Sequence, residues 1–254
     1  MSVIISDAIR LEVAGENALI LYFFEPKLRQ GNVVGSISDA RDNKVISTKL
    51  NKQVQQAAQL IRFHLADDIV DLIPSYASIL VVFDLIKIDH HQLRNKLQVL
   101  LQDTDTQAIN QGKVIKLPVY YSLESGRDLP RVAKRAQLSI EQVIEIHQAQ
   151  TYSVYAIGFA PGFAYLGEVE QRIATPRLSS PRLKVPKGAV AIADRQTAVY
   201  PADSPGGWNI IGLCPLAMFD ANLSPPMPIS VGDSVKFVAI DKQQYLELGG
   251  KICN

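Results

Sequence analysis

The sequence has few cysteines and no long hydrophobic run. Cys214 and Cys253 are the only cysteines among 254 residues, and their separation matches no metal-binding or redox motif. Two distant thiols argue against a disulfide-stabilised scaffold and favour a reducing, cytoplasmic setting. The apolar runs, such as Ile79–Phe83, are far shorter than the ~20 residues of a membrane-spanning helix. No basic stretch followed by an apolar run opens the chain, so we expect neither a secretory signal nor a membrane interaction.

The chain also lacks an excess of charge of either sign. It carries 26 Lys and Arg against 25 Asp and Glu, whereas a protein that coats nucleic acid needs a strong basic excess. We therefore expect no nucleic-acid partner. With 47% hydrophobic and 20% charged residues, the composition is that of a folded globular protein.

Several common enzyme motifs are missing as well. The sequence contains no GxxxxGK(S/T) phosphate loop, no GxGxxG, no HExxH and no GxSxG nucleophile motif. We expect no metal site, and a nucleotide would need either a less common type of site or help from another chain.

Residues 1–110 are predicted to form a small α/β domain. Short apolar runs are typical of buried strands, and apolar residues that recur at helical spacing indicate amphipathic helices. Residues 26–43 are rich in Gly, Ser, Asn and Asp and are predicted to form a loop, and the polar stretch 102–112 is the best linker candidate. The expected strands cover 18–24 and 78–83, and the expected helices cover 48–66 and 93–101.

Residues 111–254 are predicted to form a β-barrel or sandwich. A strand over 114–121 contains a proline and should lie at an edge or bulge. Asp128, followed by Leu-Pro, should begin a helix as its acidic cap, and the capping box Ser139–Gln142 should open a second one. Short strand candidates then alternate with Gly and Pro turns. These candidates cover 154–159, 189–193, 197–200, 208–213 and 234–240.

The segment Gly158–Gly167 contains four turn-forming residues and three aromatic residues in ten positions, which makes it a poor helix and a poor central strand. One interpretation is a surface turn with a few buried rings. The other is a shaped loop, in which glycines such as Gly162 let backbone amides approach a ligand while Phe159 and Tyr165 form apolar walls.

A second block, Ser204–Trp208, contains consecutive glycines, Gly206 and Gly207, after a proline. Pro-Gly-Gly favours a tight turn, and successive N–H groups in such a turn form an anion-binding nest. The alternative is a plain hairpin turn with Trp208, the only tryptophan, in the core.

A third block, residues 172–195, carries six basic residues and one acidic residue. Its three prolines prevent a helix, so Arg177, Arg182 and Lys187 recur five residues apart on an extended chain. Arginine suits bidentate recognition of a carboxylate or phosphate. A solvated basic face is the alternative.

Among the four histidines, His147 is the one that the pattern brings near these blocks. It ends the second short helix, just before the strand that leads into Gly158. A helix C-terminus favours a protonated imidazole. His147 is therefore either a residue of the site or a packing and capping histidine.

In this order along the chain, the motifs resemble the KipI/PxpB family, also called allophanate hydrolase subunit 1, which includes the B subunits of 5-oxoprolinases. The resemblance covers nearly the whole chain and is weaker in its N-terminal half. The motifs that carry it are GFxPGFxYLG from Gly158, Thr175-Pro-Arg, Ser180-Pro-Arg, Val185-Pro-x-Gly, Gln196-Thr, Tyr200-Pro, Ser204-Pro-Gly-Gly-Trp and Gly232-Asp-x-Val-x-Phe.

The resemblance implies a small α/β N-terminal domain followed by a cyclophilin-like β-barrel domain. It implies two partners, a KipA/PxpC-type subunit and a LamB/YcsF (PxpA)-type subunit. With them, family members hydrolyse 5-oxo-L-proline to L-glutamate, coupled to hydrolysis of ATP. ATP would be shared with a partner subunit.

The motif positions suggest roles in such a reaction, which builds up negative charge that cations and backbone N–H groups stabilise. We expect His147 to transfer or position a proton and Arg182 to hold an anionic group. The further candidates for binding substrate or phosphate are Phe159, Gly162, Tyr165, Arg177, Lys187, Gln196, Gly206, Gly207 and Trp208.

Two alternative functions stay open. A KipI-type protein would bind a histidine kinase and inhibit it, and a urea-carboxylase-like carboxyltransferase subunit would act with a biotin carrier. The chain also departs from the family pattern at Ala164, Ala189, Leu213 and Cys214, where proline, serine, arginine and threonine are usual. The missing arginine leaves the identity of the ligand open.

Overall fold

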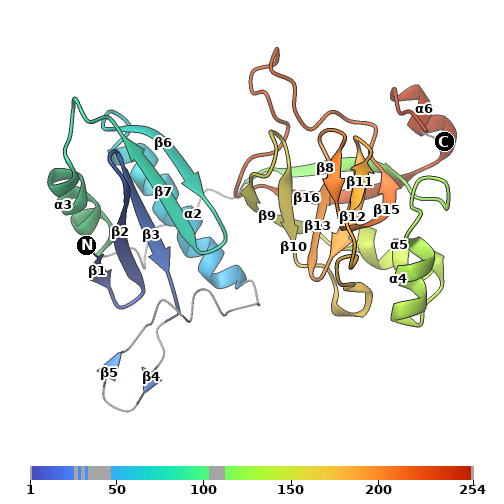
Figure 1. The fold of residues 1–254 in the computed structure, drawn as a ribbon, viewed down its shortest axis with the longest axis horizontal. Helices are drawn as coiled ribbons and strands as arrows, with labels where there is room; N and C mark the ends of the chain where they lie inside the picture. Colours follow the sequence, from blue (N-terminus) through green and yellow to red (C-terminus); the bar gives the residue numbers. More distant parts are fainter. Residues whose placement is uncertain (1, 26–27, 30–31, 34–46, 103–111, 253–254) are drawn as a thin grey trace. The chain divides into compact units, whose positions relative to one another are not determined.

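The chain forms two compact units, Met1–Asn110 and Gln111–Asn254 (Figure 1). The first unit combines a β-sheet with two helices, and the second is built on a closed barrel. The computed structural model describes residues 2–25, 28–29, 32–33, 47–102 and 112–252.

The first unit is a five-stranded antiparallel sheet in the order β1-β2-β3-β7-β6. Buried and half-buried residues alternate in β3 and β7, so one side of each strand faces a core. The apolar side chains of α2 and α3 complete that core. The elements are β1 (Ser2–Ser6), β2 (Ile9–Gly15), β3 (Ala18–Phe23), α2 (Thr48–His64), β6 (Ile69–Pro74), β7 (Ser78–Phe83) and α3 (His90–Leu101).

The expected strands at β3 and β7 and the expected helices at α2 and α3 are confirmed. The sequence pattern missed β1, β2 and β6. Each of these strands contains a register shift, and a bulge breaks the period of two on which strand recognition depends. The expected loop 26–43 and linker 102–112 lie largely outside the described residues. Inside the first of them, β4 (Leu28–Arg29) and β5 (Asn32–Val33) pair with each other, so this part is not simply a loop.

The second unit is a closed barrel, as the resemblance implied. Its strands follow the order β10-β13-β12-β15-β8-β16-β9. β8 and β16 are parallel along their whole length, whereas the other pairs are antiparallel. The strands are β8 (Val114–Tyr120), β9 (Tyr152–Ile157), β10 (Ala164–Gly167), β12 (Ala189–Ala193), β13 (Gln196–Val199), β15 (Asn209–Leu213) and β16 (Ser234–Ile240). A separate two-stranded pair consists of β11 (Arg182–Val185) and β14 (Ser204–Gly206).

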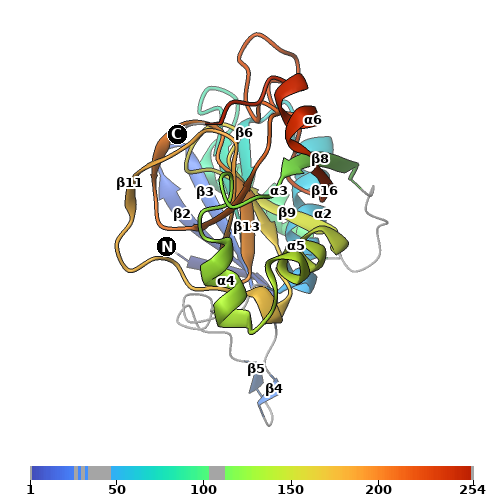
Figure 2. The same cartoon turned by 90° about the vertical axis from the view of Figure 1, so that its right-hand side faces the viewer.

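Helices α4 (Leu129–Ala136) and α5 (Ile140–Ala149) lie side by side against the barrel (Figure 2). The capping box that opens α5 is confirmed: Ser139 Oγ accepts from the Gln142 amide at 3.2 Å, and the Gln142 side chain accepts from the Ser139 amide at 2.9 Å. The short helix η2 (Gln171–Ile173) contacts both α4 and α5, and α6 (Lys242–Glu247) contacts β8. No helix among the described residues has the length and hydrophobicity that spanning a bilayer requires.

Two expectations about the barrel strands need correction. Segment Gly158–Gly167 supplies a barrel strand, β10, because its last four residues pair with β9 and β13. The proline-containing strand β8 is not at an edge of the closed barrel. Its pairing with β15 is limited to Tyr120 and Leu213, so Pro118 lies where few ladder hydrogen bonds are lost.

Candidate functional site

The structure brings the basic segment and the Pro-Gly-Gly segment together, and Ser204–Gly206 forms strand β14 rather than the expected tight turn. β11 and β14 pair antiparallel, with Arg182 opposite Gly206 and Val185 opposite Ser204. The Leu178 amide donates to the carbonyl of Gly207 at 2.7 Å. Two of the blocks that stand out in the sequence therefore form one surface of the barrel unit.

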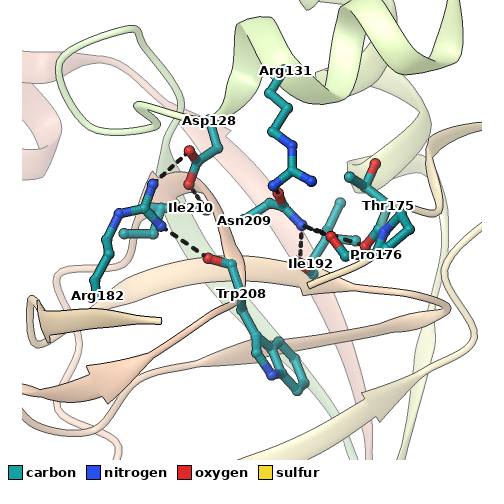
Figure 3. Close-up of polar contacts among 9 residues, drawn as sticks. All are labelled: Asp128, Arg131, Thr175, Pro176, Arg182, Ile192, Trp208, Asn209 and Ile210. Carbon is teal, nitrogen blue, oxygen red and sulfur yellow. Dashed lines mark hydrogen bonds and ion pairs between the residues drawn. The ribbon is translucent and has the colours of Figure 1, made fainter. Parts of the chain in front are cut away.

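Asp128 and Arg182 form an internal ion pair (Figure 3). Arg182 Nη2 donates to Asp128 Oδ1 at 2.7 Å, and Arg182 Nη1 donates to the carbonyl of Trp208 at 3.3 Å. The other carboxylate oxygen of Asp128 accepts from the Ile210 amide at 2.7 Å. Asp128 occupies the N-cap position of α4 but makes no side-chain capping hydrogen bond, contrary to expectation, because its carboxylate is engaged here.

Asn209 is the fully buried centre of a second set of contacts (Figure 3). Its Nδ2 donates to the carbonyls of Pro176 and Ile192, both at 3.0 Å, and to that of Thr175 at 3.4 Å. Its Oδ1 accepts from Arg131 Nη1 at 2.8 Å. We call Asp128, Arg131, Arg182 and Asn209 the loop clamp, because they tie the basic segment to the barrel wall and to α4.

Most of the cations in the basic segment are neutralised by acidic residues from other parts of the chain. The ion pairs are Arg172 with Glu170, Arg182 with Asp128, Lys184 with Asp203 and Arg195 with Glu168. The segment is therefore not a six-cation anion site, and Arg182 in particular is already occupied by a carboxylate. Within the part of the chain that the structure describes, Arg177 and Lys187 are the two cations of this segment without an acidic partner within 4.0 Å.

Arg177 lies over an aromatic cluster. Its guanidinium carbon is 5.5 Å from the centre of the Trp208 ring, within the range of a cation–π interaction. Phe163 is the hub of the cluster, with ring centres 4.8–5.7 Å from those of its four neighbours. We define the aromatic–arginine cluster as Phe159, Phe163, Tyr165, Tyr200, Trp208 and Arg177.

The cluster is open to solvent at one side. Phe159 is 64% exposed, Arg177 is exposed and Tyr165 is half-buried, whereas Phe163 and Trp208 are buried. Burial raises the pKa of the Tyr165 hydroxyl, and the Arg177 charge opposes that rise. Phe159 and Tyr165, whose rings both pack against Phe163, therefore add apolar surface to a cluster that also contains an exposed guanidinium.

The glycines serve a purpose different from the one expected. A Cβ at Gly162, where φ is +83°, would lie 2.4 Å from the carbonyl oxygen of Met218, and one at Gly206 would lie 2.5 Å from Tyr200 Oη. Both glycines thus permit close packing against other parts of the protein. Gly207 has more space, because its nearest neighbour would be 3.6 Å away.

His147 is not placed to act on a bound ligand. It is fully buried, and Nδ1 lies 2.8 Å from Tyr121 Oη while Nε2 lies 3.0 Å from Thr197 Oγ1. Its ring stacks on Phe237 at 4.7 Å between centres. Burial lowers the pKa of His147 to about 3, so the ring is neutral and fully hydrogen-bonded. The packing interpretation of His147 replaces the proton-transfer one.

The remaining candidates lie near or outside the cluster. Lys187 is exposed, and its backbone amide donates to Asp203 Oδ1 at 2.8 Å. Gln196 begins β13, where it pairs with Gly167 of β10. The family departures are all buried, Ala164 and Cys214 in one hydrophobic cluster of the barrel unit and Ala189 and Leu213 in the other.

Phe163 and Tyr200 lie in motifs that the sequence analysis named without choosing them as site candidates, whereas Arg131 and Asn209 were not indicated at all. Asn209 carried a usable signal, because it is a polar residue at the head of an otherwise apolar, fully buried strand, and such residues need hydrogen-bond partners. Arg131 had none. Within the described residues, no group of three or more His, Cys, Asp or Glu side chains is arranged to hold a metal ion.

Comparison with known proteins identifies the family. The carboxyltransferase domain, subdomain C and D, matches residues 36–229. The B subunit of the 5-oxoprolinase of Bacillus subtilis (strain 168) is 39% identical over 219 residues, which cover 81% of this chain and 90% of the relative.

Solved structures agree with the fold. The crystal structure of TTHA0988 in space group P6522 has a TM-score of 0.71 at 30% identity; the match covers 94% of this chain but only 41% of that longer chain. The K. lactis urea amidolyase has a TM-score of 0.69 at 15% identity over 96% of this chain and 16% of that chain, and this likeness shows the fold alone. The ordered motifs, the closed barrel and these matches together show that the chain belongs to the carboxyltransferase subdomain C and D family and, within it, to the KipI/PxpB group of 5-oxoprolinase B-subunit homologues.

Proposed function

We propose that this chain is the B subunit of an ATP-dependent 5-oxoprolinase, which converts 5-oxo-L-proline to L-glutamate together with A and C subunits. The observation that carries the proposal is the match to the B subunit of the Bacillus subtilis 5-oxoprolinase over nine-tenths of that protein. That relative is named as one subunit of an enzyme, which is the reason to expect that activity needs partner chains.

The chemistry explains why the reaction needs ATP and preorganised charge. A lactam amide resists attack by water, and transfer of the γ-phosphoryl group of ATP to the lactam oxygen activates the ring carbon. Water then adds to that carbon, the ring C–N bond breaks to release the amino group, and a second water frees phosphate from the resulting acyl phosphate. Each step places negative charge on oxygen, which cations and N–H donors stabilise.

Within this chain, Arg177 is the residue best placed to hold such an anion. Its guanidinium carbon lies over the Trp208 ring, and within the described residues it has no acidic partner within 4.0 Å, so it can bind a carboxylate or phosphate. Phe159 and Tyr165, which both pack against Phe163, provide apolar surface in the same cluster for the ring of the substrate. ATP bound at a surface shared with a partner subunit is part of the same proposal.

The proposal is tested by co-expressing the chain with its A and C subunits and measuring ATP-dependent release of glutamate from 5-oxo-L-proline. We expect Arg177→Ala to lower kcat/KM by about a hundredfold, because the charge-assisted contact is lost, while Arg177→Lys keeps part of it. Arg172→Ala is the matched control, since Arg172 is an exposed arginine of the same segment that already pairs with Glu170. Wild-type kcat/KM in the Arg177→Ala complex would refute the role of Arg177.

Two further outcomes bear on the proposed activity itself. The chain alone should release almost no glutamate, and full turnover without partners would contradict the shared-site model. Biotin-dependent carboxylation of urea, with no release of glutamate, would instead favour the carboxyltransferase alternative.

A further inference from the structure

We infer that Asn209 is the positioning residue that fixes the stack of Arg177 on Trp208 and thereby the direction in which the guanidinium meets an anion. The inference adds a positioning residue to the proposed function. Only the expected effect of Asn209 on turnover rests on that proposed function. Its structural part concerns this chain alone.

The first step concerns the peptide unit that precedes Arg177. The carbonyl oxygen of Pro176 and the nitrogen of Arg177 share one peptide plane, so a hydrogen bond to that oxygen restrains the plane. Asn209 Nδ2 holds this oxygen at 3.0 Å. Restraining this plane narrows the range of directions in which the Arg177 side chain leaves the backbone.

The second step concerns the other member of the stack. Trp208 is the residue directly before Asn209, which begins strand β15, so a fixed Asn209 restrains the position from which the Trp208 side chain leaves the chain. The buried amide of Asn209 is bonded to the carbonyl of Ile192 on the neighbouring strand β12, at 3.0 Å. The Asn209 side chain therefore holds both Trp208 and the Pro176–Arg177 peptide in place relative to strand β12 of the barrel wall (Figure 3).

The third step shows that Asn209 acts locally. Other hydrogen bonds hold the backbone on both sides: the Asp194 amide donates to the Thr175 carbonyl at 2.8 Å, and the Leu178 amide donates to the Gly207 carbonyl at 2.7 Å. Loss of the Asn209 amide should leave these bonds in place. The segment then stays docked, while the Pro176–Arg177 peptide gains freedom to rotate.

Intrinsic fluorescence reports the stack directly, because Trp208 is the only tryptophan. We expect Arg177→Ala to change the emission of Trp208 by removing a cation from its ring, and Asn209→Ser to reproduce most of that change. Asn222→Ser is the matched control; Asn222 lies in an exposed turn, bonded to Asp220, and its replacement should leave the emission unchanged. Wild-type emission in a folded Asn209→Ser chain, with altered emission in Arg177→Ala, would overturn the inference.

A second variant distinguishes the contact of Asn209 Oδ1 with Arg131 from the contacts of Asn209 Nδ2 with the backbone carbonyls. Arg131→Ala removes the donor to Asn209 Oδ1 and leaves the bonds to the loop carbonyls, so the emission should stay at the wild-type value. If Arg131→Ala changed the emission as much as Asn209→Ser, the anchor would be α4 rather than the Pro176 carbonyl, and the inference would be wrong. If Asn209→Ser does not fold, NMR measurement of hydrogen exchange in the wild-type chain tests the inference instead. The side-chain amide protons of Asn209 should exchange slowly with solvent, and rapid exchange would count against the inference.

The effect on turnover is measured in the reconstituted complex. We expect Asn209→Ser to raise the KM for 5-oxo-L-proline about tenfold with a much smaller change in kcat, because a misdirected cation weakens binding of an anionic substrate. If Arg177→Ala leaves turnover intact, the proposed role of Arg177 fails, whereas the fluorescence result still decides whether Asn209 positions the stack.

Discussion

His147 and Asp128 show how surroundings decide the role of a single residue. Both are titratable groups in sequence contexts that suggest catalysis or capping. His147 is neutral because its burial disfavours the charged ring, and Asp128 is committed to Arg182 and to the Ile210 amide. Neither role follows from neighbouring residues, because the partners lie 26–82 positions away along the chain.

The buried His147 should make the folded chain sensitive to acid. Its pKa is about 3 in the folded state, below the ordinary value of 6.5, so the unfolded chain binds a proton at pH values between these limits while the folded chain does not. Stability from this group is therefore complete above pH 6.5 and falls as the pH drops toward 3, by up to about 1.4 kcal/mol per pH unit.

Urea unfolding of the wild type and of His147→Gln at pH 7 and pH 5 measures this contribution. The wild type should lose more stability than the variant between the two pH values. Equal losses would show that His147 is not buried in its neutral form.

The Asp128–Arg182 pair should contribute to folding. Removing Arg182 leaves a carboxylate whose side chain is 9% exposed without its charged partner. We expect Arg182→Ala to lower the free energy of unfolding by about 2 kcal/mol, discounted because the Arg182 side chain is 22% exposed. Urea denaturation checks this, with Arg172→Ala as a surface-pair control. An unchanged midpoint for Arg182→Ala would contradict a structural role and reopen the direct anion-binding one.

Local sequence signals predicted the helices α2, α3 and α5, but they missed several strands. The capping box at Ser139 and the apolar spacing of α2 are properties of a few neighbouring residues, so they survive without tertiary context. β10 was missed because its pairing with β9 and β13, rather than its own composition, makes it a strand.

The turn that leads into β10 offers a matched pair of glycines. Gly162 has φ of +83°, and a Cβ there would meet the Met218 carbonyl at 2.4 Å, whereas a Cβ at Gly158 would meet nothing within 4 Å. We expect Gly162→Ala to destabilise the chain by about 1–3 kcal/mol and Gly158→Ala to have a much smaller effect. Thermal unfolding of both variants is the measurement, and equal shifts in Tm would show that the close approach at Gly162 has no influence on stability.

Across the complete chain, the two units have separate cores. One core belongs to the sheet and helices of the first unit, and the barrel unit has two buried clusters of its own, on opposite faces of β12. A unit with its own core is expected to fold alone. Residues 112–254 expressed by themselves should therefore unfold cooperatively in urea with near-UV circular dichroism that indicates fixed aromatic packing. A broad, non-cooperative transition would show that the barrel unit depends on the first one.

Residue order was sufficient to predict the barrel's turn-rich strand pattern, the helices of the first unit and the family, because these depend on periodicity, capping residues and ordered motifs. It also pointed to Arg177, Trp208 and Tyr165 as candidate site residues. Which cations remain free follows instead from the folded chain. Charge in the segment 172–195 is cancelled by Asp128, Glu168, Glu170 and Asp203, all from outside it, and electrostatic pairing depends on distance in space rather than on separation along the chain.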